Sequence, residues 1–356
     1  MKVTMGKTRW KIWFSLALLV IICAGGFYLL HRLGYISNIR VSKTKDGWVC
    51  SGPIQYNLMY PRSRPIVSNK NLVLLEKYRK RSLRQFLHHS YYITALALTD
   101  GHTVYRTKIS INGRPLQVLG IWPWQENVVV WGYYQEEPGL FNHICSITIL
   151  NNRGKILKQF PLTLPLRPMA VDEKNSVLLC QQKVDEKDFE QHLDPQILRM
   201  VELPSGTEKF QVKISLFTDL ATDQDGNVYI NFLNQRNDAW IDYVEKRAPY
   251  LSACIEKYSV VPWQKIWSVK VTPEKGYSQL LKCEKNTLWY AVYDEDSAPL
   301  VEDKRKWIGG PLNCKTGEAV ESQRKCDPYR IEAEVDGKHF LVTRIDDKVH
   351  VTVSSE

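Results

Sequence analysis

Polar turns that lead directly into apolar, alternating stretches recur along the chain from about residue 65 to the C-terminus. Six such junctions are marked by the residue before the apolar stretch: Asn71, Asn127, Asn175, Asn227, Asn286 and Lys338. Neighbouring junctions are 48 to 59 residues apart. The apolar positions alternate with a period of about two residues, which predicts β-strands and excludes a helical solenoid. A local phrase that returns at a nearly constant spacing indicates a repeat protein.

Each repeat contains four predicted strands, labelled a to d in chain order. One apolar strand precedes the junction, a second follows it, and a hairpin closes the unit, as in ITILNNRGKILKQF at 147–160. The glycine of that hairpin supplies the positive φ that a short loop requires. Four antiparallel strands in a unit of about 50 residues are typical of a β-propeller blade. A β-sandwich would not repeat its phrases in phase.

The phrase LATDQDGNVYINF at 220–232 resembles the NHL-repeat and related six-bladed propellers, whose blades carry hydrophobic-x-x-D-x-x-G-N-hydrophobic across the a–b turn. The match is full at Asp223, Gly226 and Asn227, and it is partial in the third and last units. The resemblance implies an all-β fold, a six-bladed β-propeller, and concerns architecture only. Asp223 and Asp225 lack the other ligands of a calcium loop, so we interpret this segment as an a–b turn.

The repeat count predicts six blades. Five units have all four strands, at 65–112, 113–164, 165–215, 216–272 and 273–323. The last unit, from about residue 329, has three strands before the chain ends. The strand-like segment 48–58 precedes the first unit, and we expect it to supply the missing outer strand and so to close the ring.

The N-terminus contains an apolar stretch at 12–30, long enough to cross a bilayer as a helix. Basic residues precede it, so the sequence predicts a signal anchor with a cytoplasmic tail at 1–11, a membrane-proximal stalk at 31–47 and an extracytoplasmic propeller at 48–356. The cell membrane is then both the location and one partner. Two alternatives stay open: a signal peptide cleaved near Ala24-Gly25-Gly26, or a lipoprotein modified at Cys23.

The net charge of +10 is concentrated at the N-terminus. Residues 1–45 hold eight basic residues and no acidic ones. Removing those eight from the 48 basic residues leaves 40 against 38 acidic residues. The rest of the chain is therefore nearly neutral, and nucleic acid is not expected as a partner.

Eight cysteines occur, and one of them, Cys23, lies in the N-terminal apolar stretch. The remaining seven are an odd number, so at least one is unpaired within the chain. Several fall in apolar strand patterns, which favours buried free thiols. Cys314 and Cys326 share one segment and are the best candidates for a disulfide.

The b–c connections are long, whereas the predicted a–b and c–d turns are tight. Long loops on a rigid scaffold are where binding surfaces are usually built. The first connection, 78–90, is basic, the fourth, 235–252, carries aromatic residues, and the fifth, 294–310, begins with an acidic cluster. The predicted binding residues are Trp240, Tyr243, Tyr250, Arg79, Arg81, His88, His89, Asp294 and Asp296.

These patterns favour a binding platform for a protein, peptide or cell-surface polymer over an enzyme. No GxSxG, HExxH, P-loop or GxGxxG motif occurs, and no catalytic residue, metal site or cofactor is predicted. The six-bladed relatives include lactonases, lyases and hydrolases that act from the central channel. An extracytoplasmic enzyme with metal-assisted hydrolase or lyase chemistry in that channel is therefore the alternative.

Overall fold

The computed structural model describes most of the repeat region and a short part of the N-terminus. The described residues are 20–23, 38–55, 64–81, 87–135, 143–162, 166–182, 196–214, 217–233, 253–271, 277–284, 286–293, 307–308, 310–320, 330–345 and 348–354.

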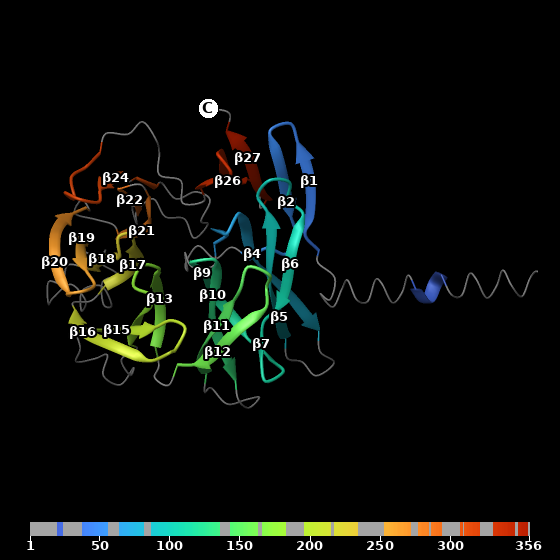
Figure 1. Cartoon of the computed structure of the whole chain (residues 1–356), viewed down its shortest axis with the longest axis horizontal. Helices are drawn as coiled ribbons and strands as arrows, with labels where there is room; N and C mark the ends of the chain where they lie inside the picture. The colour runs from blue at the N-terminus through green and yellow to red at the C-terminus, as the bar shows by residue number, and fades with distance from the viewer. Residues whose placement is uncertain are drawn as a thin grey trace, which may run out of the picture.

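Within this part of the chain, six antiparallel sheets of four or five strands are set around a central axis (Figure 1). Blade 1 contains β3 (Ile66–Ser68), β4 (Asn71–Arg81), β5 (Leu87–Ala97) and β6 (Thr103–Lys108). Blade 2 contains β9 (Gln117–Trp124), β10 (Asn127–Gln135), β11 (His143–Leu150) and β12 (Ile156–Pro161). Blade 3 contains β13 (Leu166–Asp172), β14 (Val177–Gln182), β15 (Gln196–Glu202) and β16 (Glu208–Ile214). A small hairpin, β7 (Ser110–Ile111) and β8 (Arg114–Pro115), joins blades 1 and 2.

The second half of the ring repeats this order. Blade 4 contains β17 (Phe217–Thr222), β18 (Asn227–Leu233), β19 (Ala253–Ser259) and β20 (Gln264–Lys270). Blade 5 contains β21 (Tyr277–Glu284) and β22 (Thr287–Tyr293), with β23 (Trp307–Ile308) and β24 (Pro311–Asn313) both paired to β22. Blade 6 contains β25 (Ile331–Val335), β26 (Lys338–Ile345) and β27 (Lys348–Ser354), then β2 (Gly47–Ser51) and β1 (Arg40–Thr44).

The first strand of each blade is the innermost one. β25 contacts β3, β3 contacts β9, β9 contacts β13, β13 contacts β17, and β17 contacts β21. This strand order is that of a β-propeller, and it confirms the propeller resemblance drawn from the sequence.

The core lies between neighbouring blades, because side chains of a strand point alternately to its two faces. On β4, Val73 and Leu75 pack towards blade 2, whereas Leu72 and Leu74 pack towards blade 6. A strand covered on both faces is apolar at consecutive positions, which explains the run LVLL at 72–75.

Glycines of the c–d turns fix how closely the blades approach. In blades 1, 2, 3 and 5 this glycine has a positive φ and lies against an aromatic ring on the fourth strand of the preceding blade. The pairs are Gly101 with Trp48, Gly154 with Tyr105, Gly206 with Phe160 and Gly317 with Trp267. At Gly154, for example, a Cβ would lie 2.5 Å from the Tyr105 ring, so glycine is required there by both space and backbone conformation.

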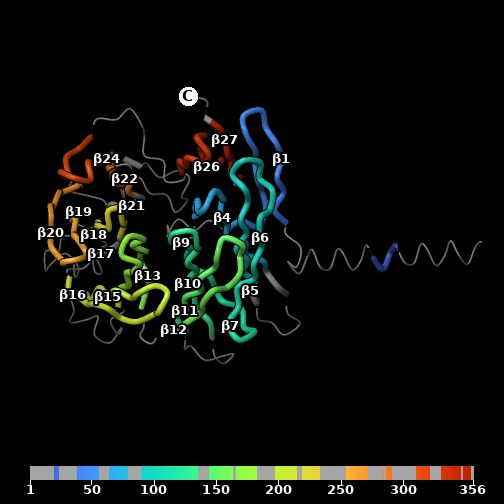
Figure 2. Tube along the Cα trace, in the orientation of Figure 1, coloured from blue at the N-terminus to red at the C-terminus, as the bar shows by residue number. Residues whose placement is uncertain are grey.

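The N-terminal segment closes the ring, as predicted. β2 pairs with β27, with Trp48 opposite Val351 and Cys50 opposite Val349. Figure 2 shows the blue segment that contains β1 beside the red β26 and β27 in this sheet. Residues 53–55 then pair with β4 of blade 1, through a bridge between Ile54 and Glu76.

The closing sheet differs from the expectation in one respect. β1 adds a fifth strand outside β2, with Val41 opposite Cys50. Residues 40–47, which we expected to belong to a stalk at 31–47, are therefore part of blade 6 and its β1–β2 turn. The reason is that the edge of β2 offers unpaired backbone groups, which the preceding segment satisfies by folding back as a hairpin.

The predicted membrane-spanning helix at 12–30 is not supported. Among the residues described, no helix is long and apolar enough to cross a membrane. The fold class that the structure supports is therefore an all-β propeller alone. The extracytoplasmic placement, which rested on the helix, stays a prediction.

Candidate functional site: the b–c face and the networks that support the blades

The two faces of the ring differ in how the strands are joined. Two residues, Asn69 and Lys70, join β3 to β4, and the other described a–b turns are similarly short. On the opposite face, residues 183–195 join β14 to β15, 234–252 join β18 to β19, and 294–306 join β22 to β23. We call this second face, where strands b and c are joined, the b–c face.

Four of the predicted binding residues lie on described strands. Arg79 and Arg81 are on β4, and His88 and His89 are on β5, with Arg79 opposite His89 in the register. The segment 78–90, predicted to be a loop, is instead a hairpin with 82–86 between its strands, because the β4–β5 ladder continues to Arg81 and Leu87. The remaining predicted binding residues lie outside the described residues: Trp240, Tyr243, Tyr250, Asp294 and Asp296.

A buried charged cluster lies on the same β4–β5 hairpin, further from residues 82–86. The fully buried carboxylate of Glu76 accepts hydrogen bonds from the hydroxyls of Tyr78 and Thr94. The Arg106 guanidinium on β6 donates to the same carboxylate at 3.1 and 3.3 Å. The carboxylate is therefore saturated by donors from three strands of blade 1, as a buried charge requires.

Two aromatic rings enclose the cation of this cluster. The Arg106 guanidinium carbon lies 3.7 Å from the centre of the Tyr92 ring and 5.4 Å from that of Tyr78. Burial, reinforced by the hydrogen bond to Glu76, raises the pKa of Tyr78 to about 12. The Tyr78 hydroxyl oxygen also accepts from the backbone N–H of Asn38 at 2.9 Å. The cluster thus links the β4–β5 hairpin, which carries the basic residues Arg79 and Arg81, to the segment that precedes β1.

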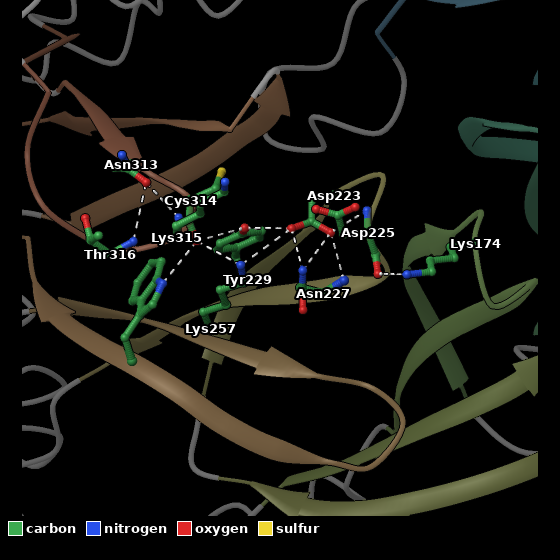
Figure 3. A network of polar contacts seen from close by, with 11 residues as sticks. Lys174, Asp223, Asp225, Asn227, Tyr229, Lys257, Asn313, Cys314, Lys315 and Thr316 are labelled. Carbon is green, nitrogen blue, oxygen red and sulfur yellow. Dashed lines mark hydrogen bonds and ion pairs between the residues drawn. The ribbon is translucent and has the colours of Figure 1, made fainter.

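A second network lies at the opposite face, between blades 4 and 5 (Figure 3). It begins at Asp223, in the a–b turn of blade 4. Asp223 Oδ1 accepts from the backbone N–H groups of Asp225 at 2.9 Å and Asn227 at 2.8 Å. Asp223 Oδ2 accepts from Asn227 Nδ2 and from the Tyr229 hydroxyl, each at 2.8 Å. The motif recognised in the sequence is therefore a self-capped turn, and its aspartate is occupied by protein donors.

The network reaches blade 5 at the backbone carbonyl of Cys314. Lys257 Nζ donates to this oxygen at 2.8 Å and Trp267 Nε1 donates at 3.2 Å. The buried Lys257 ammonium also lies 3.8 Å from Asp223 Oδ2, which balances its charge. Figure 3 shows Tyr229 and Lys257 lying between Asp223 and Cys314. One carbonyl of blade 5 thus gathers donors from two strands of blade 4.

The ionisable groups of this network are shifted by burial and by each other. Burial raises the pKa of Tyr229 above its ordinary range. The thiol of Cys283 donates a hydrogen bond to the sulfur of Cys314, which lowers the pKa of Cys314 and raises that of Cys283. The two thiols therefore differ, and both belong to the apolar cluster at the contact of blades 4 and 5.

We expect Asp223→Ala to lower the free energy of unfolding by about 1–3 kcal/mol, because the buried Tyr229 hydroxyl and two turn N–H groups lose their acceptor. Chemical denaturation followed by tryptophan fluorescence measures the change. Asp225→Ala is the matched control in the same turn, since the Asp225 side chain is exposed and its backbone contacts remain. Equal losses in the two variants would contradict a specific role for the Asp223 carboxylate.

The sequence pattern identified the turn of this network but not the residues that link the turn to blade 5. The DxxGN phrase identified Asp223 and Asn227. Lys257, Tyr229 and Trp267 were missed because they occupy ordinary positions in alternating strands. One usable signal was Lys257 itself, a charged residue at an inward position of strand c. Among the described residues, no group of three or more His, Cys, Asp and Glu side chains is placed to hold a metal ion.

Comparison with known proteins returns similar folds at low identity. No model of a protein family matches the chain, and no curated protein matches it. The β-propeller domain of the trilobed protease from Pyrococcus furiosus is 10% identical, covers 83% of this chain and 82% of that chain, and has a TM-score of 0.43. The Dos1 propeller is 9% identical over 88% of this chain and 92% of that chain, with a TM-score of 0.41. The tricorn protease is 12% identical over 78% of this chain and 30% of that chain, with a TM-score of 0.41. The strand order of this chain defines it as a β-propeller protein.

Proposed function

We propose that this β-propeller is a binding platform that presents its b–c face to a protein or peptide partner. The observation that carries the proposal is the asymmetry of the two faces. The described a–b and c–d turns are short and internally bonded, whereas long connections join strands b and c in blades 3, 4 and 5. Connections of that length on a rigid ring are the usual site of recognition.

The composition of these connections supports a protein or peptide ligand. Residues 234–252 contain Trp240, Tyr243 and Tyr250, and aromatic residues of these types are enriched among interface hot spots. The basic hairpin of blade 1 carries Arg79 and Arg81, and residues 294–306 carry Asp294 and Asp296. Charges of both signs around one face would favour a single orientation of a charged partner.

The scaffold beneath the face suits this role. Strands β4, β14 and β18 contribute buried apolar residues on both faces, so each packs against both neighbouring blades. The buried Glu76 cluster anchors the base of the basic hairpin. A rigid support lowers the conformational entropy lost on binding.

Replacement of 240–250 by a Gly-Ser connector of equal length is expected to abolish partner binding and to leave the thermal midpoint nearly unchanged. The replaced residues include the three aromatic anchors, whereas the core lies in the strands. Replacement of 184–194, of the same length and without Trp or Tyr, is the matched control.

Binding is measured first by photo-crosslinking from position 241, with a crosslinker in the a–b turn at position 224 as the control for the other face. A crosslinked partner is then identified, purified and titrated against both replacements. Crosslinking of a polymer, or from position 224 alone, would contradict the proposal. A large fall of the midpoint in the 240–250 replacement would show that the aromatic residues belong to the core and would also contradict it.

A further inference from the structure

Two cysteines of blade 5 come together beside the network of Figure 3. Cys283 is on β21 and pairs in register with Leu288 of β22, and Leu288 pairs on its other side with Leu312 of β24. Cys314 follows β24, and its backbone N–H donates to the Asn286 carbonyl at 2.7 Å. Both cysteines therefore flank the same end of β22, next to the a–b turn of blade 5.

Their side chains share one largely apolar cluster. Cys283 and Cys314 pack in one cluster with Leu288, Leu312 and Tyr290. The Cys283 thiol donates its hydrogen bond to the Cys314 sulfur. Both thiols are free in the structure. Cys326, which the sequence favoured as the disulfide partner of Cys314, lies outside the described residues.

The surroundings make the two thiols unequal. The hydrogen bond from Cys283 and the Lys257 ammonium lower the pKa of Cys314, while burial and the Asp223 carboxylate oppose this. The pKa of Cys283 is raised, first by its bond to Cys314 and then by burial. Because the thiolate is the nucleophile, Cys314 is the sulfur that reacts first and Cys283 is the one that resolves. Cys50, in contrast, lies between blades 6 and 1, where burial raises its pKa to about 12.

We propose that Cys283 and Cys314 form an oxidisable dithiol, which a small peroxide converts to an intramolecular disulfide. Cys314 is 2% exposed, so a small neutral oxidant fits the site better than a bulky disulfide reagent. The Cys314 thiolate attacks one oxygen of hydrogen peroxide, the O–O bond breaks, and hydroxide leaves as water after protonation, which produces a sulfenic acid. The Cys283 sulfur then attacks the Cys314 sulfur and expels the second oxygen as water. Two thiols and one peroxide yield one disulfide and two waters, with two electrons transferred from sulfur to oxygen.

The bond would act on the contact between blades 4 and 5. The turn that carries Cys314 also presents the carbonyl that Lys257 and Trp267 bind. Closing a sulfur–sulfur bond of about 2.05 Å draws the two sulfurs nearer than a hydrogen-bond contact. The disulfide would therefore form at a position where movement of the turn that carries Cys314 changes the contact with blade 4.

The full chain, purified with reductant and then desalted, is titrated with hydrogen peroxide. Remaining thiols are blocked with N-ethylmaleimide in denaturant, and unreduced tryptic peptides are identified by mass spectrometry. We expect 283–285 linked to 307–315 to become the dominant disulfide peptide, with equal loss of both cysteines from the alkylated pool, while Cys50 stays alkylated. Persistence of both thiols as alkylated species after the peroxide titration, or linkage of Cys314 to Cys326, would overturn the proposal.

Two variants separate the candidate partners of Cys314. In Cys283→Ser, the reaction is expected to stop at the Cys314 sulfenic acid, which dimedone traps. In Cys326→Ser, the disulfide is expected to form as in the unmodified chain. Loss of the disulfide in Cys326→Ser with retention in Cys283→Ser would assign the bond to Cys326 and refute the pair. The peptide map of the unmodified chain decides the question even if Cys283→Ser fails to fold.

Discussion

A chain that begins at residue 61 is expected to lose the cooperative unfolding of the ring. Truncation removes β1, β2 and the 53–55 bridge to blade 1, and with them Trp48, whose indole N–H donates to the Leu98 carbonyl at 2.8 Å. Phe340, Val349 and Val351 would lose Trp48 and Cys50 from the cluster in which they pack. An exposed sheet edge and an uncovered apolar surface then favour aggregation over closure.

The matched control begins at residue 38, immediately before β1 and with every described strand retained. Differential scanning calorimetry of the two chains measures the difference. Trp48→Ala in the full chain is the finer probe, and we expect it to cost about 3–5 kcal/mol because a fully buried indole is replaced by a cavity. If the chain from 61 melts within about 2 °C of the chain from 38, the closure by β2 contributes little to stability.

Glu76→Ala is expected to lower the free energy of unfolding by about 3–5 kcal/mol, the largest effect that we expect from substituting one member of an ion pair among the described residues. The substitution leaves the Arg106 guanidinium half-enclosed by Tyr78 and Tyr92 without the carboxylate that balances it. It also removes the acceptor of two buried hydroxyls. Urea denaturation of each variant measures the loss.

The double variant Glu76→Leu with Arg106→Leu tests whether the loss arises from an unbalanced buried charge. We expect it to be less destabilised than Glu76→Ala, because neither charge is then left without its partner. Asp336→Asn is the control for an exposed pair, since Lys70 and Asp336 are 60% and 63% exposed, and a change of at most about 1 kcal/mol is expected. A loss in Asp336→Asn as large as that in Glu76→Ala would contradict the distinction between the two pairs.

The predicted binding residues illustrate which features of a site a sequence can indicate. The positions of Trp240 and Tyr243 between two strands follow from the repeat, because alternation and turn residues locate β18 and β19. The repeat pattern did not show whether residues 78–90 form a loop or extend the two strands. The basic residues of that segment are compatible with either, and the register of β4 with β5 decides it.

Local patterns along the chain were enough to predict the repeat, the strands and the closure of the ring by an N-terminal strand. The repeat and the strands follow from the spacing of apolar positions and from turn residues such as Gly154. The closure follows from the last repeat, which has three predicted strands where the others have four. The tertiary structure alone decided the fifth strand β1, the partners of Glu76 and the placement of Cys314 and Cys283 in one cluster. It also removed support for the helix at 12–30. The physical reason is that hydrogen-bond partners and sulfur contacts join strands far apart in the chain, and no local pattern records which distant group meets a given side chain.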